Sequence, residues 1–188
     1  MGRDRFVGRL EHGFEISEPF RYFPPGGQWV YHGNQQAMHF SFLFNWAGKP
    51  WLTQKWTHSI MSRYYGRGVA NAYIGQDNQG QMSAWYIMDA IGLFQTDGGC
   101  RAEPIYEIAS PLFEKVVIDQ GRRYGRGKTF TIEAKNASRK NKYIQKAMLN
   151  GKVLNTFYFP ASELLKGGSL VLEMGDTPDK NWGMVIDD

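Results

Sequence analysis

The sequence has little of several features that mark particular classes of protein. Its 188 residues include one cysteine, Cys100, so no intrachain disulfide bond and no cysteine-based zinc site is expected. No apolar run approaches the roughly 18 residues that a membrane span requires, so we expect no association with a membrane. The first residues lack the apolar stretch of a secretory signal peptide, and we expect none at this end.

The net charge is also small. The chain has 22 Lys and Arg residues against 18 Asp and Glu residues, a net charge of +4. So small an excess does not indicate a nucleic-acid-binding protein. The four histidines are His12, His32, His39 and His58. Because none of them pair at the spacing of a helical zinc site, a structural or surface role is favoured for each.

Aromatic residues, in contrast, are abundant, at 15% of the chain. The spacing of apolar residues predicts helices over residues 6–14, 50–64 and 81–91, because apolar side chains recur there every three or four positions. Residues 35–46 are apolar on nearly all sides, which fits a buried helix or a buried strand. A glycine-rich loop is expected over residues 66–80.

After residue 100 the pattern changes to that of strands. Asn150-Gly151 is a strong signal for a β-hairpin, and one helical turn is expected over residues 162–167. The predicted strands cover residues 115–118, 129–134, 143–149, 152–154 and 169–173.

The predicted fold class is α+β, with a helical portion over residues 1–100 and a small antiparallel β portion over residues 101–188. The helices alone would expose large apolar faces. Either the two portions cover each other, or the helices belong to a larger layer outside this chain.

The most informative polar segment is residues 75–80, Gly-Gln-Asp-Asn-Gln-Gly. It stands between two glycines and leads directly into a predicted helix. The amides of Gln76, Asn78 and Gln79 can exchange hydrogen bonds with sugar hydroxyls, and Asp77 is the one carboxylate. A helix cap, in which Asp77 or Asn78 accepts from free backbone N–H groups, is equally compatible with this pattern.

Five stretches in order resemble glycoside hydrolase family 92, the calcium-dependent exo-acting α-mannosidases. The first includes Gly-Asn-Gln at 33–35 and Phe-Asn-Trp-Ala-Gly-Lys-Pro-Trp at 44–51. The second and third are Gly-Gln-Met-Ser-Ala-Trp-Tyr at 80–86 and Tyr-Glu-Ile-Ala-Ser-Pro-Leu-Phe at 106–113. The remaining two are Lys-Thr-Phe-Thr-Ile-Glu-Ala at 128–134 and Leu-Asn-Gly-Lys at 149–152.

This resemblance implies that the chain is the C-terminal part of such an enzyme. Its helices would be the last helices of an (α/α)6 barrel, followed by the β portion. The implied activity is inverting hydrolysis of terminal α-linked mannose from glycans, by a periplasmic or secreted enzyme. The implied cofactor is Ca²⁺, which holds hydroxyls of the mannose. A Glu acts as general acid, and a pair of carboxylates in the glycine-flanked loop acts as general base.

The sequence departs from the family pattern at the residues of the base. Gln76 and Asn78 occupy the positions of the two base aspartates, and an amide can orient a water molecule but cannot take its proton. Asp77 lies at the middle position, where an extended backbone directs its side chain the opposite way. The general-acid Glu belongs to a family segment that would precede Met1, so the upstream part of the same enzyme is an expected partner.

The resemblance assigns further residues to binding roles. Asn34 and Gln35 match positions that line the leaving-group subsite, and Gln79 joins them as a candidate for binding substrate. The backbone oxygen of His39 falls near the calcium site, although calcium is expected to bind this chain weakly or not at all. Three tryptophans are expected in the core rather than stacked on a sugar: Trp46, Trp51 and Trp85.

These observations predict part of an α-mannosidase that is inactive as an isolated chain. A glycan-binding relic without catalysis is the alternative. A third hypothesis is that the β portion is an interaction module.

Overall fold

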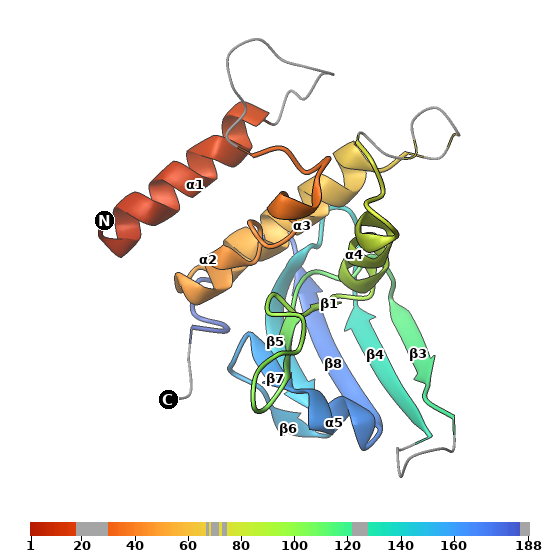
Figure 1. Cartoon of the computed structure of the whole chain (residues 1–188). Coiled ribbons are helices and arrows are strands. Elements are labelled where there is room, and N and C mark those ends of the chain that lie inside the picture. The colour runs from red at the N-terminus through yellow and green to blue at the C-terminus, as the bar shows by residue number, and fades with distance from the viewer. Residues whose placement is uncertain (18–29, 67, 69–71, 73–74, 122–127, 185–188) are drawn as a thin grey trace.

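Helices occupy the first half of the chain and most strands the second in the computed structural model (Figure 1), which describes residues 1–17, 30–66, 68, 72, 75–121 and 128–184. The α+β class is therefore confirmed. The helices are α1 (Arg3–Ser17), α2 (Leu43–Trp46), α3 (Pro50–Tyr64), α4 (Gln81–Ala90) and α5 (Ala161–Leu165), with a 3-10 turn η1 (Gln35–Ala37). None of the helices in these residues has the length and hydropathy of a membrane span.

Helix α3 is the centre of the helical layer and is buried on nearly all sides. It begins at Pro50, whose fixed backbone angle suits the first turn of a helix. On one side Phe14 of α1 stacks on Trp56, with ring centroids 4.9 Å apart. On the other side Gln54 Oε1 accepts a hydrogen bond of 2.9 Å from the backbone N–H of Ile144, in the sheet. The two portions thus cover each other along α3.

Residues 35–46 contain the short helical segments η1 and α2 joined by turns, so the buried-strand alternative is wrong. Asn34 begins the first segment, since its side-chain oxygen accepts from the backbone N–H of Gln35 at 2.8 Å. The apolar rings of Phe42 and Phe44 are fully buried, and Phe42 stacks on Phe94. The predicted loop 66–80 lies partly outside the described residues.

The larger sheet has five strands in the order β3-β4-β8-β5-β6. Its inward side chains form a second apolar core beneath the helices, with Phe130, Ile132 and Leu172 at its centre. The strands are β3 (Lys115–Asp119), β4 (Thr129–Lys135), β5 (Tyr143–Leu149), β6 (Lys152–Val153) and β8 (Gly168–Gly175).

The predicted small antiparallel β portion needs correction at one strand pair, since the other pairs of the larger sheet are antiparallel. Strands β4 and β8 run parallel, with Phe130 opposite Gly168 and Lys135 opposite Glu173. Parallel neighbours require a long crossover connection, and the chain between them supplies one through β5, β6, β7 (Tyr158–Pro160) and α5. The predicted hairpin is confirmed, because Asn150 and Gly151 have φ values of 50° and 79° between β5 and β6, as a two-residue I′ turn requires.

A second sheet of three strands was not predicted. It consists of β1 (Leu93–Phe94), β2 (Ile105–Ile108) and β7 (Tyr158–Pro160), in the order β1-β2-β7. Leu93 pairs with Ile108, and Ile105 pairs with Pro160. This sheet joins segments from both sides of residue 100. The division of the chain into two portions at that residue stays a prediction.

Candidate functional site

The loop before α4 holds an uncommon backbone conformation. Asn78, Gln79 and Gly80 have φ values of 51°, 61° and 92°, three consecutive residues in the left-handed region. Asn and Gly adopt this region readily, whereas Gln does so at a cost. Such conformations cluster at functional sites, where the surrounding structure holds them in place. The loop exposes Gln76 and Gln79 and half-buries Asp77 and Asn78.

Asp77 caps helix α4. Its Oδ1 accepts hydrogen bonds of 2.9 Å from both the backbone N–H and the hydroxyl of Ser83. Its backbone oxygen accepts from the N–H of Met82 at 3.1 Å. The capping interpretation therefore describes what this side chain does, and the carboxylate turns toward the helix.

The structure brings the two predicted binding segments together. Asn78 Nδ2 donates to Asn34 Oδ1 at 3.4 Å, across 44 residues of sequence. The backbones also touch, because a Cβ added to Gly75 would stand 1.9 Å from the carbonyl oxygen of Gly33. Only glycine allows this approach. Gln35 follows Asn34 and is exposed beside it.

Buried side chains behind the loop hold the two segments in place. His32 is 1% exposed, and its Nε2 lies 3.0 Å from the hydroxyl of Tyr65. That hydroxyl donates to the carbonyl oxygen of Met82 at 3.2 Å, and Trp85 Nε1 donates to the carbonyl oxygen of Met38 at 2.9 Å. Burial lowers the pKa of His32 to about 3, so its ring is neutral and structural, as predicted.

Sequence reasoning did not single out Tyr65 as a support of the loop. Its partners His32 and Met82 are distant in sequence, and no local pattern marks such a contact. The polar groups that the loop presents are therefore amides, together with one carboxylate already engaged at the helix start. Amides can hold a water molecule or a sugar hydroxyl in place but cannot act as a general base.

The oxygen atoms near the loop that could bind a metal ion do not form a calcium site. The backbone oxygen of His39 accepts N–H groups from Phe42 at 3.0 Å and Leu43 at 3.2 Å, which engages both of its lone pairs. Within the described residues, no three His, Cys, Asp or Glu side chains gather where they could hold a metal ion. Calcium prefers six to eight oxygen ligands, and this set does not fit it.

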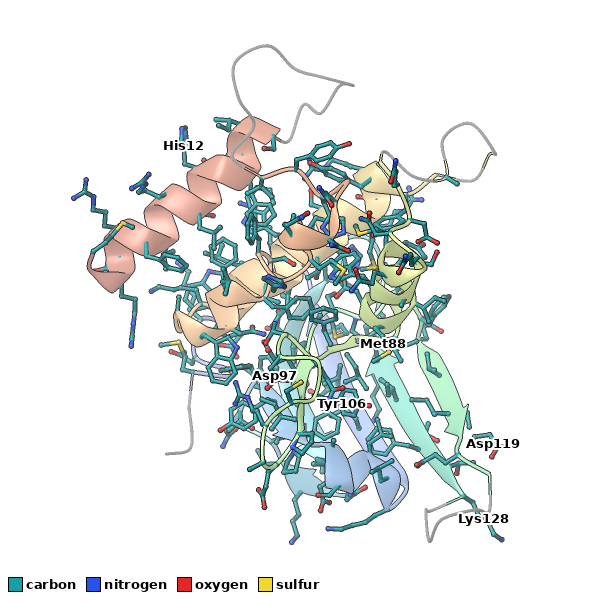
Figure 2. The ribbon with its side chains drawn as sticks, in the orientation of Figure 1. His12, Met88, Asp97, Tyr106, Asp119 and Lys128 are labelled. Carbon is teal, nitrogen blue, oxygen red and sulfur yellow. The ribbon has the colours of Figure 1, made fainter. Side chains whose placement is uncertain are left out.

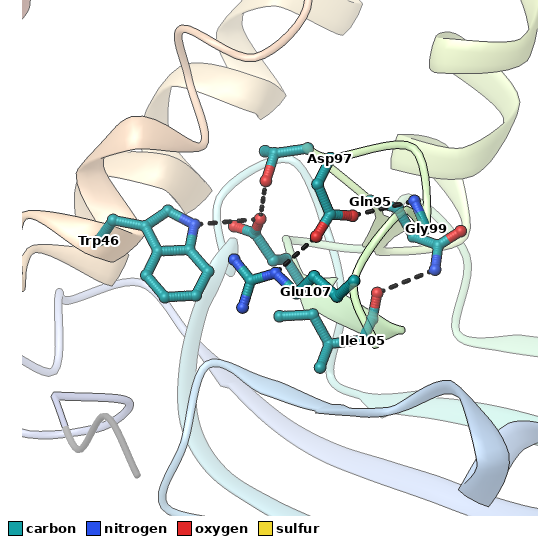
Figure 3. A network of polar contacts seen from close by, with 8 residues as sticks. Trp46, Gln95, Asp97, Gly99, Ile105 and Glu107 are labelled. Atoms are coloured by element: carbon teal, nitrogen blue, oxygen red, sulfur yellow. Dashed lines mark hydrogen bonds and ion pairs between the residues drawn. The ribbon is translucent and has the colours of Figure 1, made fainter. Parts of the chain in front are cut away.

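The three tryptophans differ in their surroundings. Trp85 is buried in the core, and Trp51 is half-buried with the Lys49 ammonium 5.1 Å from its ring centroid. Trp46 belongs to a polar network that was not predicted (Figure 3), in which its Nε1 donates to Glu107 Oε1 at 3.1 Å.

Glu107 is the centre of that network and is 1% exposed. It accepts from Asn45 Nδ2 at 3.0 Å and from the hydroxyl of Thr96. Burial raises the pKa of its carboxyl group, and these hydrogen bonds, with the nearby Arg101 guanidinium, oppose that shift. The network ties α2 to the loop after β1 and to β2, so its role is structural.

Comparisons with known proteins agree with the resemblance. The model of the glycosyl hydrolase family 92 catalytic domain matches residues 1–176. A curated relative, described as an uncharacterized secreted glycosidase of Arthroderma benhamiae, is 31% identical over 185 residues, which cover 97% of this chain and 21% of that protein.

Two solved structures of Bacteroides thetaiotaomicron proteins are also similar. The family GH92 α-mannosidase BT3965 is 29% identical with a TM-score of 0.83, over 98% of this chain and 23% of that one. The family GH92 inverting mannosidase BT2199 is 29% identical with a TM-score of 0.80, over 98% of this chain and 26% of that one. The chain thus spans about a quarter of these relatives or less.

Proposed function

The chain belongs to glycosyl hydrolase family 92, and we propose that it is the C-terminal part of an inverting α-mannosidase that removes terminal α-linked mannose from glycans. Relatives described as α-mannosidase and inverting mannosidase share its fold over 98% of its residues. The observation that supports the proposal is the contact between Asn78 and Asn34. It joins the loop to which the resemblance assigns the base positions and the segment to which it assigns the leaving-group subsite.

In this proposal the loop supplies binding groups. Asn34, Gln35 and Gln79 exchange hydrogen bonds with sugar hydroxyls, since an amide both donates and accepts. Gln76 and Asn78 hold a water molecule where other members of the family place carboxylates. Asp77 stabilises the loop through its bonds to Ser83.

We further propose that the isolated chain does not hydrolyse mannosides. An inverting enzyme needs one carboxylate that takes a proton from water and one carboxylic acid that protonates the leaving group. Each such group contributes roughly 10² to 10⁴ in rate. The loop offers amides for the first role, and the proposal assigns the second to the upstream part of the enzyme, the expected partner of this chain.

The test is turnover of an aryl α-mannoside by the purified chain, with and without added Ca²⁺. We expect no turnover above background. Turnover that is abolished both by a chelator and by Asp77→Ala would show that Asp77 is the base and that our assignment is wrong. Calorimetry with Ca²⁺ is expected to show weak binding or none, because the donor set is poor in carboxylates.

A glycan-binding relic is the second candidate function, and the amide character of the loop favours it. Mannose binding without turnover, lost in Asn34→Ala and kept in the distant Asn155→Ala, is the result that supports it. We also propose a secreted or periplasmic location, in keeping with the relative described as secreted, and no nucleic-acid partner. Salt-sensitive retention on DNA would contradict the last point.

A further inference from the structure

A cavity separate from the amide loop lies between α3, α4 and the turn after β4. Its volume is about 480 Å³, within the range of roughly 300 to 1,000 Å³ typical of small-molecule sites. The residues that define its character are His58, Met61, Tyr65, Tyr86, Leu112 and Arg139. None of the loop residues Gln76 to Gln79 lines it.

The buried imidazole of His58 forms part of the cavity wall. His58 is 8% exposed, and its Nε2 has no hydrogen-bond partner in the described part of the chain. Burial lowers the pKa of His58 to about 4, and the charges of Lys142 and Arg139 add to that shift. The ring is therefore neutral at neutral pH.

The charges around this imidazole are positive. Both Lys142 and Arg139 act on His58 electrostatically, and the described lining contains no Asp or Glu. No carboxylate oxygen of the described residues lies within 4.0 Å of the Arg139 guanidinium. A guanidinium in this position can donate two parallel hydrogen bonds to an oxyanion.

The rest of the wall is apolar or aromatic. Met61 and Leu112 contribute aliphatic surface, and the rings of Tyr65 and Tyr86 lie with centroids 4.7 Å apart. Such a wall suits the body of an organic molecule, since ligand pockets combine apolar surface with a few placed polar groups.

We infer that this cavity binds a small organic anion. Its oxyanion head group pairs with Arg139, while its apolar body packs against Tyr86 and Leu112. The inference does not depend on the proposed mannosidase function, because it uses none of the loop residues.

Calorimetry on the whole chain at neutral pH tests the ligand class. The probes are phenyl phosphate, benzoate, inorganic phosphate and the uncharged benzyl alcohol. We expect an aromatic anion to bind at least about tenfold more tightly than inorganic phosphate or benzyl alcohol, because only it satisfies both parts of the wall. The order of phenyl phosphate and benzoate identifies the head group. Equal binding of benzyl alcohol, or no saturable binding of any probe, overturns the inference.

Two matched charge variants test the place of binding. Arg139→Gln should weaken binding of the better probe about tenfold or more, since it removes the paired charge. Lys128→Gln removes one positive charge at the far end of the sheet (Figure 2) and should leave the affinity within about twofold. Equal loss in both variants would indicate attraction by net charge alone and overturn the inference.

Nuclear magnetic resonance gives a second readout that does not require a variant to fold. Titration with the better probe should move the imidazole signals of His58 and leave those of His12 unchanged, because His12 lies on the outer side of α1 (Figure 2). Unchanged His58 signals at saturation would contradict the inference.

Discussion

Among single residues, Asp89 is the least expected in its surroundings. It lies in α4, is fully buried, and neither carboxylate oxygen has a hydrogen-bond partner within the described residues. Burial raises the pKa of this carboxyl group well above 3.8. The ionised form is therefore disfavoured in the folded chain relative to the unfolded one.

The pH dependence of stability follows from the direction of this shift. The pKa of Asp89 is higher in the folded chain than in the unfolded one. The free energy of unfolding is therefore highest below the unfolded pKa of about 3.8, where Asp89 is protonated in both states. It falls as the pH rises through the folded value. Asp89→Asn, which cannot ionise, should be more stable than the original chain at pH 7, by at least about 1 kcal/mol. Near pH 3 the two should unfold alike.

Urea unfolding at both pH values measures this difference. Asp4→Asn on the exposed start of α1 is the matched control, and it should change the free energy of unfolding little at either pH. An Asp89→Asn variant less stable than the original at pH 7 would mean that the carboxylate has an ionic partner.

At the scale of elements, the loop and the segment before η1 are locked by a backbone contact. A Cβ on Gly75 would stand 1.9 Å from the oxygen of Gly33, whereas a Cβ on Gly80 would meet nothing within 4 Å. Gly80→Ala should therefore cost only the strain of its φ of 92°, about 1 kcal/mol. Gly75→Ala should cost more than about 2 kcal/mol or separate the segments.

Thermal unfolding compares the two glycine variants, and mannose binding reports whether the segments separate. If both substitutions cost the same, the close approach of the two backbones is not what positions the loop.

The elements that sequence could predict are those with a long periodic pattern. The apolar residues that recur every four positions from Leu52 to Tyr64 predict α3, and Asn150-Gly151 predicts the hairpin. Each of these signals is local in the sequence. Strands β1 and β7 have only two and three residues, too few to show alternation. The parallel pairing of β4 with β8 depends on a crossover and carries no local signal.

The candidate site shows the same division. The polar loop and the segment at Asn34 were predicted, but their contact depends on Gly33 meeting Gly75 and on Tyr65 bonding Met82. Glu107 lies in one of the stretches that resemble the family, but its partners Asn45 and Trp46 precede it by more than sixty residues. Neither contact leaves a pattern in the chain.

At the scale of the whole molecule, the Glu107 network joins the helical layer to the smaller sheet. Glu107→Ala should destabilise the chain by about 3 kcal/mol, since it leaves buried donors of Asn45 and Trp46 without an acceptor. Glu107→Gln keeps one acceptor oxygen and should cost less.

Unfolding followed by tryptophan fluorescence and by circular dichroism measures both Glu107 variants. In the original chain the two signals should change together, as expected of one cooperative unit. If they separate, the sheets fold independently of the helices, and the hypothesis that the β portion is an interaction module gains support.

The last prediction concerns restoring the base. Gln76→Asp with Asn78→Asp places two carboxylates in the loop. The change has a local cost, because Asn78 Nδ2 now donates to Asn34 Oδ1, which also accepts from Gln35 at 2.8 Å. A carboxylate at position 78 would face that oxygen, and we expect a loss of about 1 kcal/mol in stability. The double variant should still not turn over an aryl α-mannoside by itself, because in our proposal the upstream part of the enzyme protonates the leaving group and completes the pocket.

Mixing the double variant with an upstream fragment of a family 92 relative is the informative arrangement. Activity that appears only in the mixture, and not when the unchanged chain replaces the variant, would identify positions 76 and 78 as the disabled base. The matched control Gln79→Asp adds one carboxylate at an exposed position of the same loop and should not restore activity in the mixture. Hydrolysis by the double variant without the fragment would place the general acid within these 188 residues. Our assignment of the general acid to the upstream part of the enzyme would then be wrong.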